Sequence, residues 1–330
     1  MPRRRRLLRA TALALGVGFV ALGCSGPATE PASGASVTVE HGMGTTVIDG
    51  GPPSRVVALS ASWADDLLAL GVTPVGVGTL TGIGPADGKF PWQKPFDAAV
   101  VPLSLLGAPD YEAIAALDPD LILADYSANN ADVYQRLSAI APTVAQLDAG
   151  AFVSDWREQV RVAGEILDRE GSAEQLVAAN NERLAEVRRT LPGLEGKTFA
   201  LATVEGGQNL GLVSAEDDAA VAVFRELGLR LDPAVVALGG GGRRVTVAAE
   251  LAADALSADV LVIRPARNSD PIESVVPGWS MLPAVRSGAV AVVDRPTTGA
   301  LSDPSVLNIE YLLAAVRPAL ESAADRPATS

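Results

Sequence analysis

The sequence predicts two α/β lobes with mainly parallel sheets, bridged by a single long helix. In both halves, short apolar strands alternate with amphipathic helices, the order of βαβ units. A helix–turn–strand pattern at 116–123 recurs at 255–262, an offset of 139 residues. A long amphipathic stretch at 154–191 separates the two copies. Because the chain has 330 residues and is 48% hydrophobic, it can bury two cores.

The first half begins with a predicted hairpin and continues as a βαβ unit. Two alternating stretches flank HGMG, as expected of two strands joined by a turn. A segment rich in Gly, Pro and aromatic residues at 82–97 has no period, so we expect a surface loop. The predicted elements are strands at 37–40, 45–49, 55–60, 74–77 and 121–124, and helices at 63–70 and 111–117.

The second half repeats this order. A second echo relates residues 67–72 to residues 224–229 and supports a duplicated pair of lobes. The run of four glycines at 239–242 lacks the spacing of a dinucleotide site, so we interpret it as a linker. The predicted elements are strands at 198–204, 260–263 and 289–294, and helices at 218–227 and 307–320.

The stretch at 154–191 carries apolar residues at helical spacing on one face and charged residues on the other. Asp155 with Glu158 predicts its start. Gly171 followed by Ser172 predicts either a bend in one rod or a joint between two helices. An unbroken helix of this length would reach roughly 50 Å, enough to span two lobes.

The N-terminus has the order of a secretory signal: a basic head, an apolar run and then Gly23-Cys24. The window ALGC at 21–24 resembles the bacterial lipobox, in which the cysteine becomes lipidated, so we predict a lipid anchor at Cys24 rather than a plain signal peptide. The arginine run at 3–6 fits either general or twin-arginine export. Residues 25–34, rich in Pro, Ser and Gly, predict a tether.

Charge and residue types exclude several functions. Removal of the leader with its five arginines takes the net charge from −13 to −18, which argues against nucleic acid as a partner. The only histidine, His41, lies in the predicted hairpin, so a Ser/His/Asp triad is not expected. One histidine and one cysteine also leave no transition-metal site, and we predict neither an enzyme nor a resident cofactor.

A binding cleft remains. In open α/β sheets, ligands bind outside the carboxyl ends of the strands, where this sequence places polar and aromatic residues. Arginines there suit an anionic ligand and the aromatic rings suit a flat one. The predicted cleft residues are Ser62, Trp63, Trp92, Asp125, Tyr126, Ser127, Glu205, Arg264, Arg267 and Trp279.

Several stretches together resemble the periplasmic iron-siderophore binding proteins of ABC importers. They include VEHGMGTTVIDG at the hairpin, SRVVALSASWADDLLALGVTPVGV at the first βαβ unit and YEAIAALDPDLIL at the first repeat. DWREQVRVAGEILDRE is similar to the start of the family's bridging helix, and VRSGAVAVVD with SVLNIEYLL to its C-terminal end. The resemblance implies the fold of a class III periplasmic binding protein.

It also implies a function. A monomer, lipid-anchored at the extracytoplasmic face of the cell membrane, would capture a ferric siderophore and deliver it to an ABC permease. Glu112 matches the family's N-lobe glutamate that docks on the permease, and Glu250 is the best match for its C-lobe partner. The alternatives are a haem- or corrinoid-binding protein on the same scaffold, with Tyr126 or Tyr134 as haem ligand, or a surface interaction protein that has lost transport.

The predicted organisation has five parts. They are a signal peptide at 1–23, a flexible tether at 24–36, an N-terminal lobe at 37–151, a bridging helix region at 152–191 and a C-terminal lobe at 192–330.

Overall fold

The computed structural model describes residues 36–104, 107–128, 130–148, 153–206, 209–267 and 271–325. The predicted signal peptide, Cys24 and nearly all of the predicted tether lie outside these ranges. No helix in the described ranges is long and apolar enough to cross a membrane.

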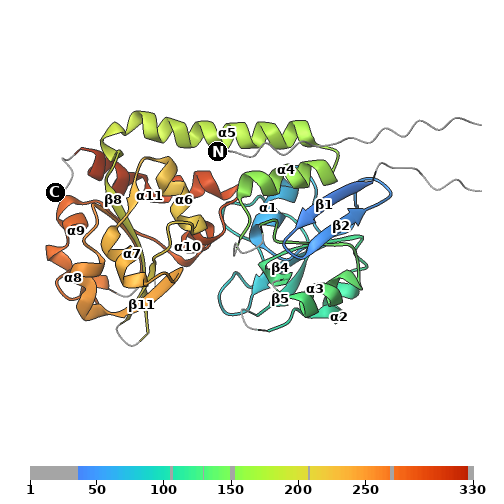
Figure 1. The fold of residues 1–330 in the computed structure, drawn as a ribbon, viewed down its shortest axis with the longest axis horizontal. Helices are drawn as coiled ribbons and strands as arrows, with labels where there is room; N and C mark the ends of the chain where they lie inside the picture. The colour runs from blue at the N-terminus through green and yellow to red at the C-terminus, as the bar shows by residue number, and fades with distance from the viewer. Residues whose placement is uncertain are drawn as a thin grey trace, which may run out of the picture. The chain divides into compact units, whose positions relative to one another are not determined.

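In the described residues, the first sheet has five parallel strands in the order β5-β4-β3-β6-β7. Figure 1 shows β4 and β5 of this sheet in the same half of the chain as the N-terminal hairpin. They are β3 (Val56–Ala58), β4 (Gly76–Leu80), β5 (Ala99–Leu103), β6 (Leu121–Asp125) and β7 (Thr143–Ala145). The antiparallel hairpin of β1 (Val37–His41) and β2 (Gly44–Ile48) precedes the sheet, as predicted. Neither β5 nor β7 was predicted from the sequence, and β7 has only three residues.

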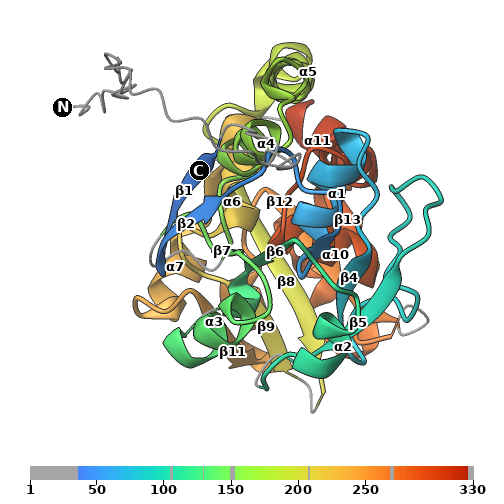
Figure 2. The same ribbon diagram turned by 90° about the vertical axis from the view of Figure 1, so that its right-hand side faces the viewer.

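Helices cover both faces of this sheet (Figure 2). Val56 and Ala58 share a core with α1 (Ala61–Ala69), whereas Val57 shares a core with α2 (Tyr111–Ala115) and α3 (Ala131–Ser138). Successive residues of β3 therefore point to opposite faces and both are buried. This explains why the strand reads as a continuous apolar run.

The second sheet is mixed. β8 lies at its centre, β12 and β13 extend it in parallel, and β9 and β11 extend the other side antiparallel. β10 also pairs with β8 in parallel. The strands are β8 (Thr198–Glu205), β9 (Asn209–Val213), β10 (Arg230–Leu231), β11 (Arg244–Ala248), β12 (Val260–Arg264) and β13 (Val290–Val292).

In the described ranges, the α-helices that accompany the second sheet are α6 (Ala219–Glu226), α7 (Pro233–Gly239), α8 (Ala252–Ala255), α9 (Pro283–Ser287), α10 (Arg295–Ser302) and α11 (Asn308–Ala324). The interpretation of 239–242 as a linker is confirmed for residues 240–242, which join α7 to β11, and was wrong for Gly239. Gly239 ends α7, and Gly240, with a φ of 55°, forms its left-handed cap before the turn into β11.

The two sequence echoes occupy equivalent places in the two sheets. In each sheet a central strand is followed later by a parallel neighbour, β6 beside β3 and β12 beside β8, and these neighbours carry the first echo. The second echo covers the end of α1 before β4 and the end of α6 before β10. The duplicated architecture predicted from the sequence is therefore present.

The segment between the sheets is a helical hairpin, not one rod. α4 (Trp156–Ile166) stops at Leu167, and α5 (Glu170–Thr190) starts three residues later. Asp168 has a φ of 55°, the left-handed conformation that commonly ends a helix. The option of two helices is therefore confirmed, but the predicted joint at Gly171 was wrong, because Gly171 lies inside α5.

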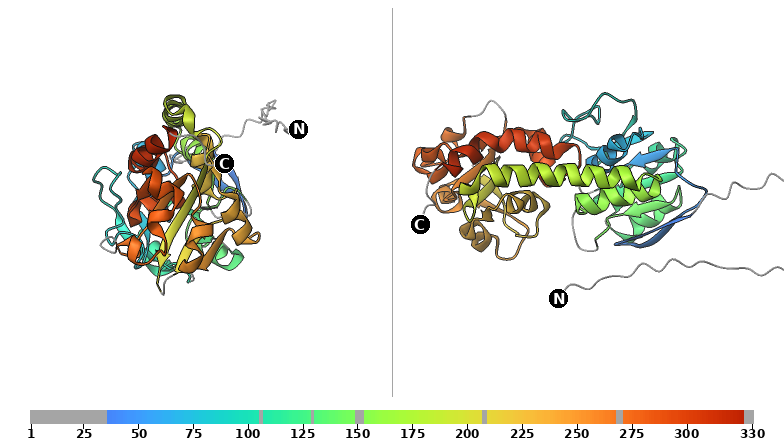
Figure 3. Two further views of the ribbon diagram at one scale, coloured as in Figure 1. Left: turned by 90° about the vertical axis from the view of Figure 1, so that its left-hand side faces the viewer. Right: turned by 90° about the horizontal axis from the view of Figure 1, so that it is seen from above.

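The two helices of the hairpin run antiparallel. Arg157 Nε donates to Asn181 Oδ1 at 2.7 Å, and Arg161 Nε lies 2.7 Å from Glu174 Oε1. The later residue of α4 therefore pairs with the earlier residue of α5, as in antiparallel helices. Beyond α4, α5 packs against α6 and α11, as the view from above shows (Figure 3). With 21 residues, about 31 Å, α5 runs from its contacts with α4 to its contacts with α6 and α11 of the second half.

Candidate functional site

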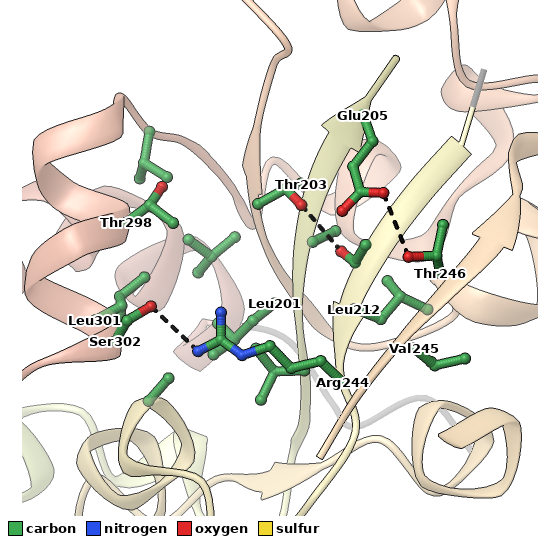
Figure 4. Close-up of a pocket in the computed structure, with 16 residues that line it drawn as sticks. Leu201, Thr203, Glu205, Leu212, Arg244, Val245, Thr246, Thr298, Leu301 and Ser302 are labelled. Carbon is green, nitrogen blue, oxygen red and sulfur yellow. Dashed lines mark hydrogen bonds between the residues drawn. The ribbon is translucent and has the colours of Figure 1, made fainter. Parts of the chain in front are cut away.

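The second sheet carries a pocket of about 150 Å³ (Figure 4). Its floor is apolar and comes from β8, β9 and β12, and α10 covers one side. Six of its lining residues carry polar side-chain groups: Thr203, Glu205, Arg244, Thr246, Thr298 and Ser302. This is a site of apolar floor and few polar groups, the composition of small-molecule pockets.

Strand and helix periodicity place the polar groups. Thr203 and Glu205 are two residues apart on β8, and Arg244 and Thr246 are two apart on β11, so each pair shares a face of the sheet. Thr203 and Thr246 both register with Gly211 on β9, which lies between them. The three strands therefore bring their side chains to one place.

Arg244 provides the positive charge at one end of the pocket. Its Nη2 donates to Ser302 Oγ at 3.2 Å, and its Nε lies 3.7 Å from Asp218 Oδ2. The side chain stays about half exposed, so the guanidinium is open to a ligand. Planar guanidinium groups suit carboxylate and other anionic oxygens.

Two further arginines lie beside the pocket. Arg264, at the end of β12, registers with Thr203 of the lining. Burial lowers the pKa of Arg264, the nearby charge of Arg295 lowers it further, and Glu205 raises it. The two guanidinium groups and Glu205 are therefore within electrostatic reach of one another, and the region has an excess of positive charge.

A buried carboxylate connects the two halves of the chain. Asp65 of α1 accepts hydrogen bonds from Trp92 Nε1 at 2.8 Å and from Gln93 Nε2 at 2.6 Å. It also accepts one from Ser305 Oγ, 240 residues away. A second link runs from the Ser62 N–H to Asp303 Oδ2 at 3.3 Å. The loop at 82–97, α1 and the segment before α11 thus share one polar network.

Four carboxyl groups lie in or around this network, and burial raises the pKa of each. The pKa of Asp65 is raised to about 7, that of Asp125 to about 8 and that of Asp303 to about 6. The pKa of Asp66 is raised well above its ordinary value by burial and by the other three charges. No basic side chain of the described residues pairs with any of the four.

The structure distributes the ten predicted cleft residues over three environments. Trp63 and Asp125 are fully buried, and so is Ser62, whose Oγ accepts a hydrogen bond from Gln159 Nε2 at 3.1 Å. These three present no surface to a ligand. Glu205 lines the pocket, and Arg264 lies beside it.

The other five are partly or fully exposed. Trp92 stacks on Phe90, with ring centroids 4.7 Å apart, and is held by Asp65. The remaining four are Tyr126, which is partly buried, Ser127, whose Oγ donates to the Leu59 carbonyl at 3.2 Å, Arg267, which is exposed, and Trp279, which packs on the core.

The two predicted docking glutamates are exposed. Glu112 lies in the first turn of α2, and Glu250 lies in the short 3-10 helix Ala249–Leu251 before α8. Neither forms an ion pair with a described residue. Each is therefore available to an outside partner, one on each half of the chain.

Most residues that build the pocket and the network were not predicted from the sequence. They are Asp65, Gly211, Arg244, Thr246, Arg295, Thr298, Ser302, Asp303 and Ser305. A signal did exist for Asp65, because two adjacent aspartates interrupt the apolar run of α1. No comparable signal marks the others. In the described ranges, no group of His, Cys, Asp and Glu side chains could hold a metal ion.

Comparison with known proteins shows the family. The profile of the family described as "Periplasmic binding protein" matches residues 56–297. The chain is 30% identical over 280 residues to the Fe(3+) dicitrate-binding periplasmic protein FecB of Escherichia coli, covering 80% of this chain and 83% of FecB. It is 29% identical over 182 residues to the probable siderophore-binding lipoprotein YfiY of Bacillus subtilis, covering 55% of this chain and 54% of YfiY.

A solved structure agrees with this assignment. The periplasmic solute binding protein from Mycobacterium smegmatis superposes with a TM-score of 0.71 at 28% identity, covering 88% of this chain and 99% of that one. Family membership confirms the predicted fold class and the prediction of a binding protein instead of an enzyme. The chain thus belongs to the periplasmic binding protein family.

Proposed function

We propose that the protein captures a ferric siderophore outside the membrane and delivers it to an ABC permease. The observation that carries the proposal is the arginine-bearing pocket on this fold. The names of two relatives, a ferric dicitrate-binding protein and a probable siderophore-binding lipoprotein, point to the same kind of ligand. The siderophore's own oxygens hold the iron, so the protein needs no metal ligands of its own.

The size of the pocket suits part of such a ligand. Pockets that enclose a whole drug-sized molecule are roughly 300–1,000 Å³. At about 150 Å³, this one takes a single arm of a chelate. Arg244 meets anionic oxygens of that arm, and the adjacent positive charge of Arg264 and Arg295 favours a chelate with negative charge.

The haem alternative needs a tyrosine that can ionise against iron, and neither candidate is suited to it. Burial and the charges of Asp303 and Asp125 raise the pKa of Tyr126, so its phenol stays protonated. The Tyr134 hydroxyl lies 3.2 Å from Thr46 Oγ1 of the N-terminal hairpin. A corrinoid and a non-transport role are outcomes that the experiments below distinguish.

Anchoring and docking complete the proposal. A lipid on Cys24 would hold the protein at the extracytoplasmic face of the cell membrane, with the tether allowing reach. Glu112 and Glu250 would pair with arginines of the permease, one glutamate from each half. Glu112→Arg should leave ligand affinity unchanged and abolish uptake; loss of affinity would refute the docking role.

A tryptophan-fluorescence titration tests the ligand. The mature protein is titrated with ferric dicitrate, ferrioxamine B, haem and cobalamin, and at least one ferric chelate should quench. Quenching by haem or cobalamin alone would refute the siderophore assignment, and quenching by none would favour the non-transport role.

Arg244→Gln tests the pocket and should weaken binding of the anionic chelate at least tenfold. Its matched control is Arg243→Gln, which removes a neighbouring guanidinium that pairs with Asp217 at 3.1 Å outside the pocket lining. Equal losses in both variants would show that Arg244 acts only through net charge.

A further inference from the structure

Glu205 is the one acidic side chain among the residues that line the pocket. Its Oε2 accepts a hydrogen bond from Thr246 Oγ1 at 3.3 Å. No described residue donates to Oε1, and no basic side chain of the described residues lies within ion-pair distance of the carboxylate. Arg244 instead donates a hydrogen bond to Ser302 Oγ, and Arg264 donates one to the Pro265 carbonyl. A carboxylate with a free oxygen therefore lines the same pocket as Arg244, the one basic side chain of the lining.

The strand beside Glu205 is shaped to receive this side chain. A Cβ atom added to Gly211 would overlap Glu205 Oε1 and would lie 2.7 Å from Thr203 Oγ1. Gly211 does not have a positive φ, so its backbone conformation would accept any residue. Glycine is needed here for space. The missing side chain leaves a seat in which the Glu205 carboxylate lies over β9 (Figure 4).

Filling the pocket would remove water from this carboxylate. A carboxylate that loses water without gaining a donor carries a large free-energy cost, whereas an ammonium group supplies a charge-assisted hydrogen bond. Sites built around such a polar group reject ligands that lack the matching group far more strongly than apolar pockets discriminate by size. Glu205 therefore favours a ligand arm that can donate a hydrogen bond to its carboxylate over an arm that cannot.

We propose that Glu205, seated over Gly211, makes the protein selective for ferric chelates whose arm ends in a protonated amine. The arm enters the pocket and donates to Glu205 Oε1, while anionic oxygens of the chelate meet Arg244. Glu205 is a specificity-determining residue in this scheme. The inference rests on the proposed function and names a chemical feature of its ligand.

A matched pair of ligands tests this selectivity for a protonated amine. Ferrioxamine B carries a free terminal amine, and its N-acetylated derivative has the same iron-binding groups without that charge. The dissociation constants of both are measured by fluorescence quenching with the mature protein. The wild type should bind the amine form at least tenfold more tightly than the acetylated form.

Glu205→Gln keeps the shape and removes the charge, so the preference for the amine should fall at least tenfold, to parity or below. Glu216→Gln, which removes an exposed carboxylate outside the pocket lining, should leave the preference unchanged. Gly211→Ala should displace Glu205 and reproduce the loss of preference. If Gly211→Ala does not fold, as judged by circular dichroism, Glu205→Gln decides alone.

The outcomes separate the two proposals. An equal preference in the wild type and Glu205→Gln, or a wild-type preference for the acetylated form, overturns the role of Glu205 and leaves the proposed function standing. If neither ferrioxamine nor ferric dicitrate binds, the proposed function itself fails.

Discussion

Asp303→Asn should stabilise the protein at neutral and alkaline pH and change little in acid. Asp303 is partly buried, and burial raises its pKa from an ordinary 3.8 to about 6. The amide oxygen introduced by the substitution can still accept the hydrogen bond from the Ser62 N–H. The change therefore removes a charge and keeps the contact.

The magnitude follows from the two pKa values. A carboxyl group with a pKa of about 6 in the folded protein and 3.8 in the unfolded chain lowers the free energy of unfolding by about 3 kcal/mol once it is ionised in both states. The charge of Asp303 also raises the pKa values of Asp65, Asp66 and Asp125. Removing it relieves these neighbours as well, so the gain should be about 3 kcal/mol or more.

The sign depends on which state binds more protons. Between pH 3.8 and about 6 the folded protein holds the proton on Asp303 and the unfolded chain does not, so stability falls as pH rises through this window. Below the window both states are protonated, and the charge costs nothing. The gain from Asp303→Asn should thus grow from under about 1 kcal/mol at pH 4 to its full value at pH 7.

Urea denaturation of the wild type and the variant at pH 4, 5, 6, 7 and 8 measures this difference. Asp254→Asn, at an exposed position on α8, serves as the matched control and should show no such trend. A stability difference between Asp303→Asn and the wild type that is constant from pH 4 to pH 8 would refute the reasoning.

Two further substitutions, one of them with a matched control, test the packing around α5 and α11. Gly193→Ala should lower the free energy of unfolding by about 1–3 kcal/mol in urea denaturation, because the added Cβ would overlap the Ala324 carbonyl oxygen. The control Gly171→Ala has open space around it and should be neutral or slightly stabilising. Equal effects of the two substitutions would contradict this reasoning. Asn180→Leu should cost about 1–3 kcal/mol in the same assay, because the buried Val306 carbonyl loses its donor at 3.0 Å; an unchanged midpoint would show that water replaces the bond.

Much of the fold could be predicted from local pattern. The patterns are the alternation in β1 and β2, the apolar run of β3 and the echo at β6 and β12. Each of these strands has a local pattern of apolar residues that matches its own burial. Short strands such as β7, with three residues, leave too little pattern to recognise. They exist because a neighbouring strand pairs with them.

The reversal between α4 and α5 was beyond local pattern. Both helices carry an amphipathic period, so the sequence left open one bent rod or two helices joined at Gly171, and neither option includes the reversal. The chain turns at Asp168. Aspartate adopts the left-handed conformation at lower cost than most residues, but its presence alone does not predict that conformation. Packing of Gly164 against Ala173 favours the hairpin, because a Cβ on Gly164 would lie 2.6 Å from the Ala173 Cβ.

The sequence by itself determined the strand and helix order, the duplication, and a polar edge at the ends of the central strands that includes Glu205 and Arg264. Only the tertiary structure decided which side chains meet. Arg244 reaches Ser302 and Asp65 reaches Ser305 across 58 and 240 residues of chain. Such contacts depend on which folded elements pack together. The local periodicity of the sequence carries no information about packing between residues so far apart in the chain. The same docking buries Trp63 and leaves Glu205 with space over Gly211.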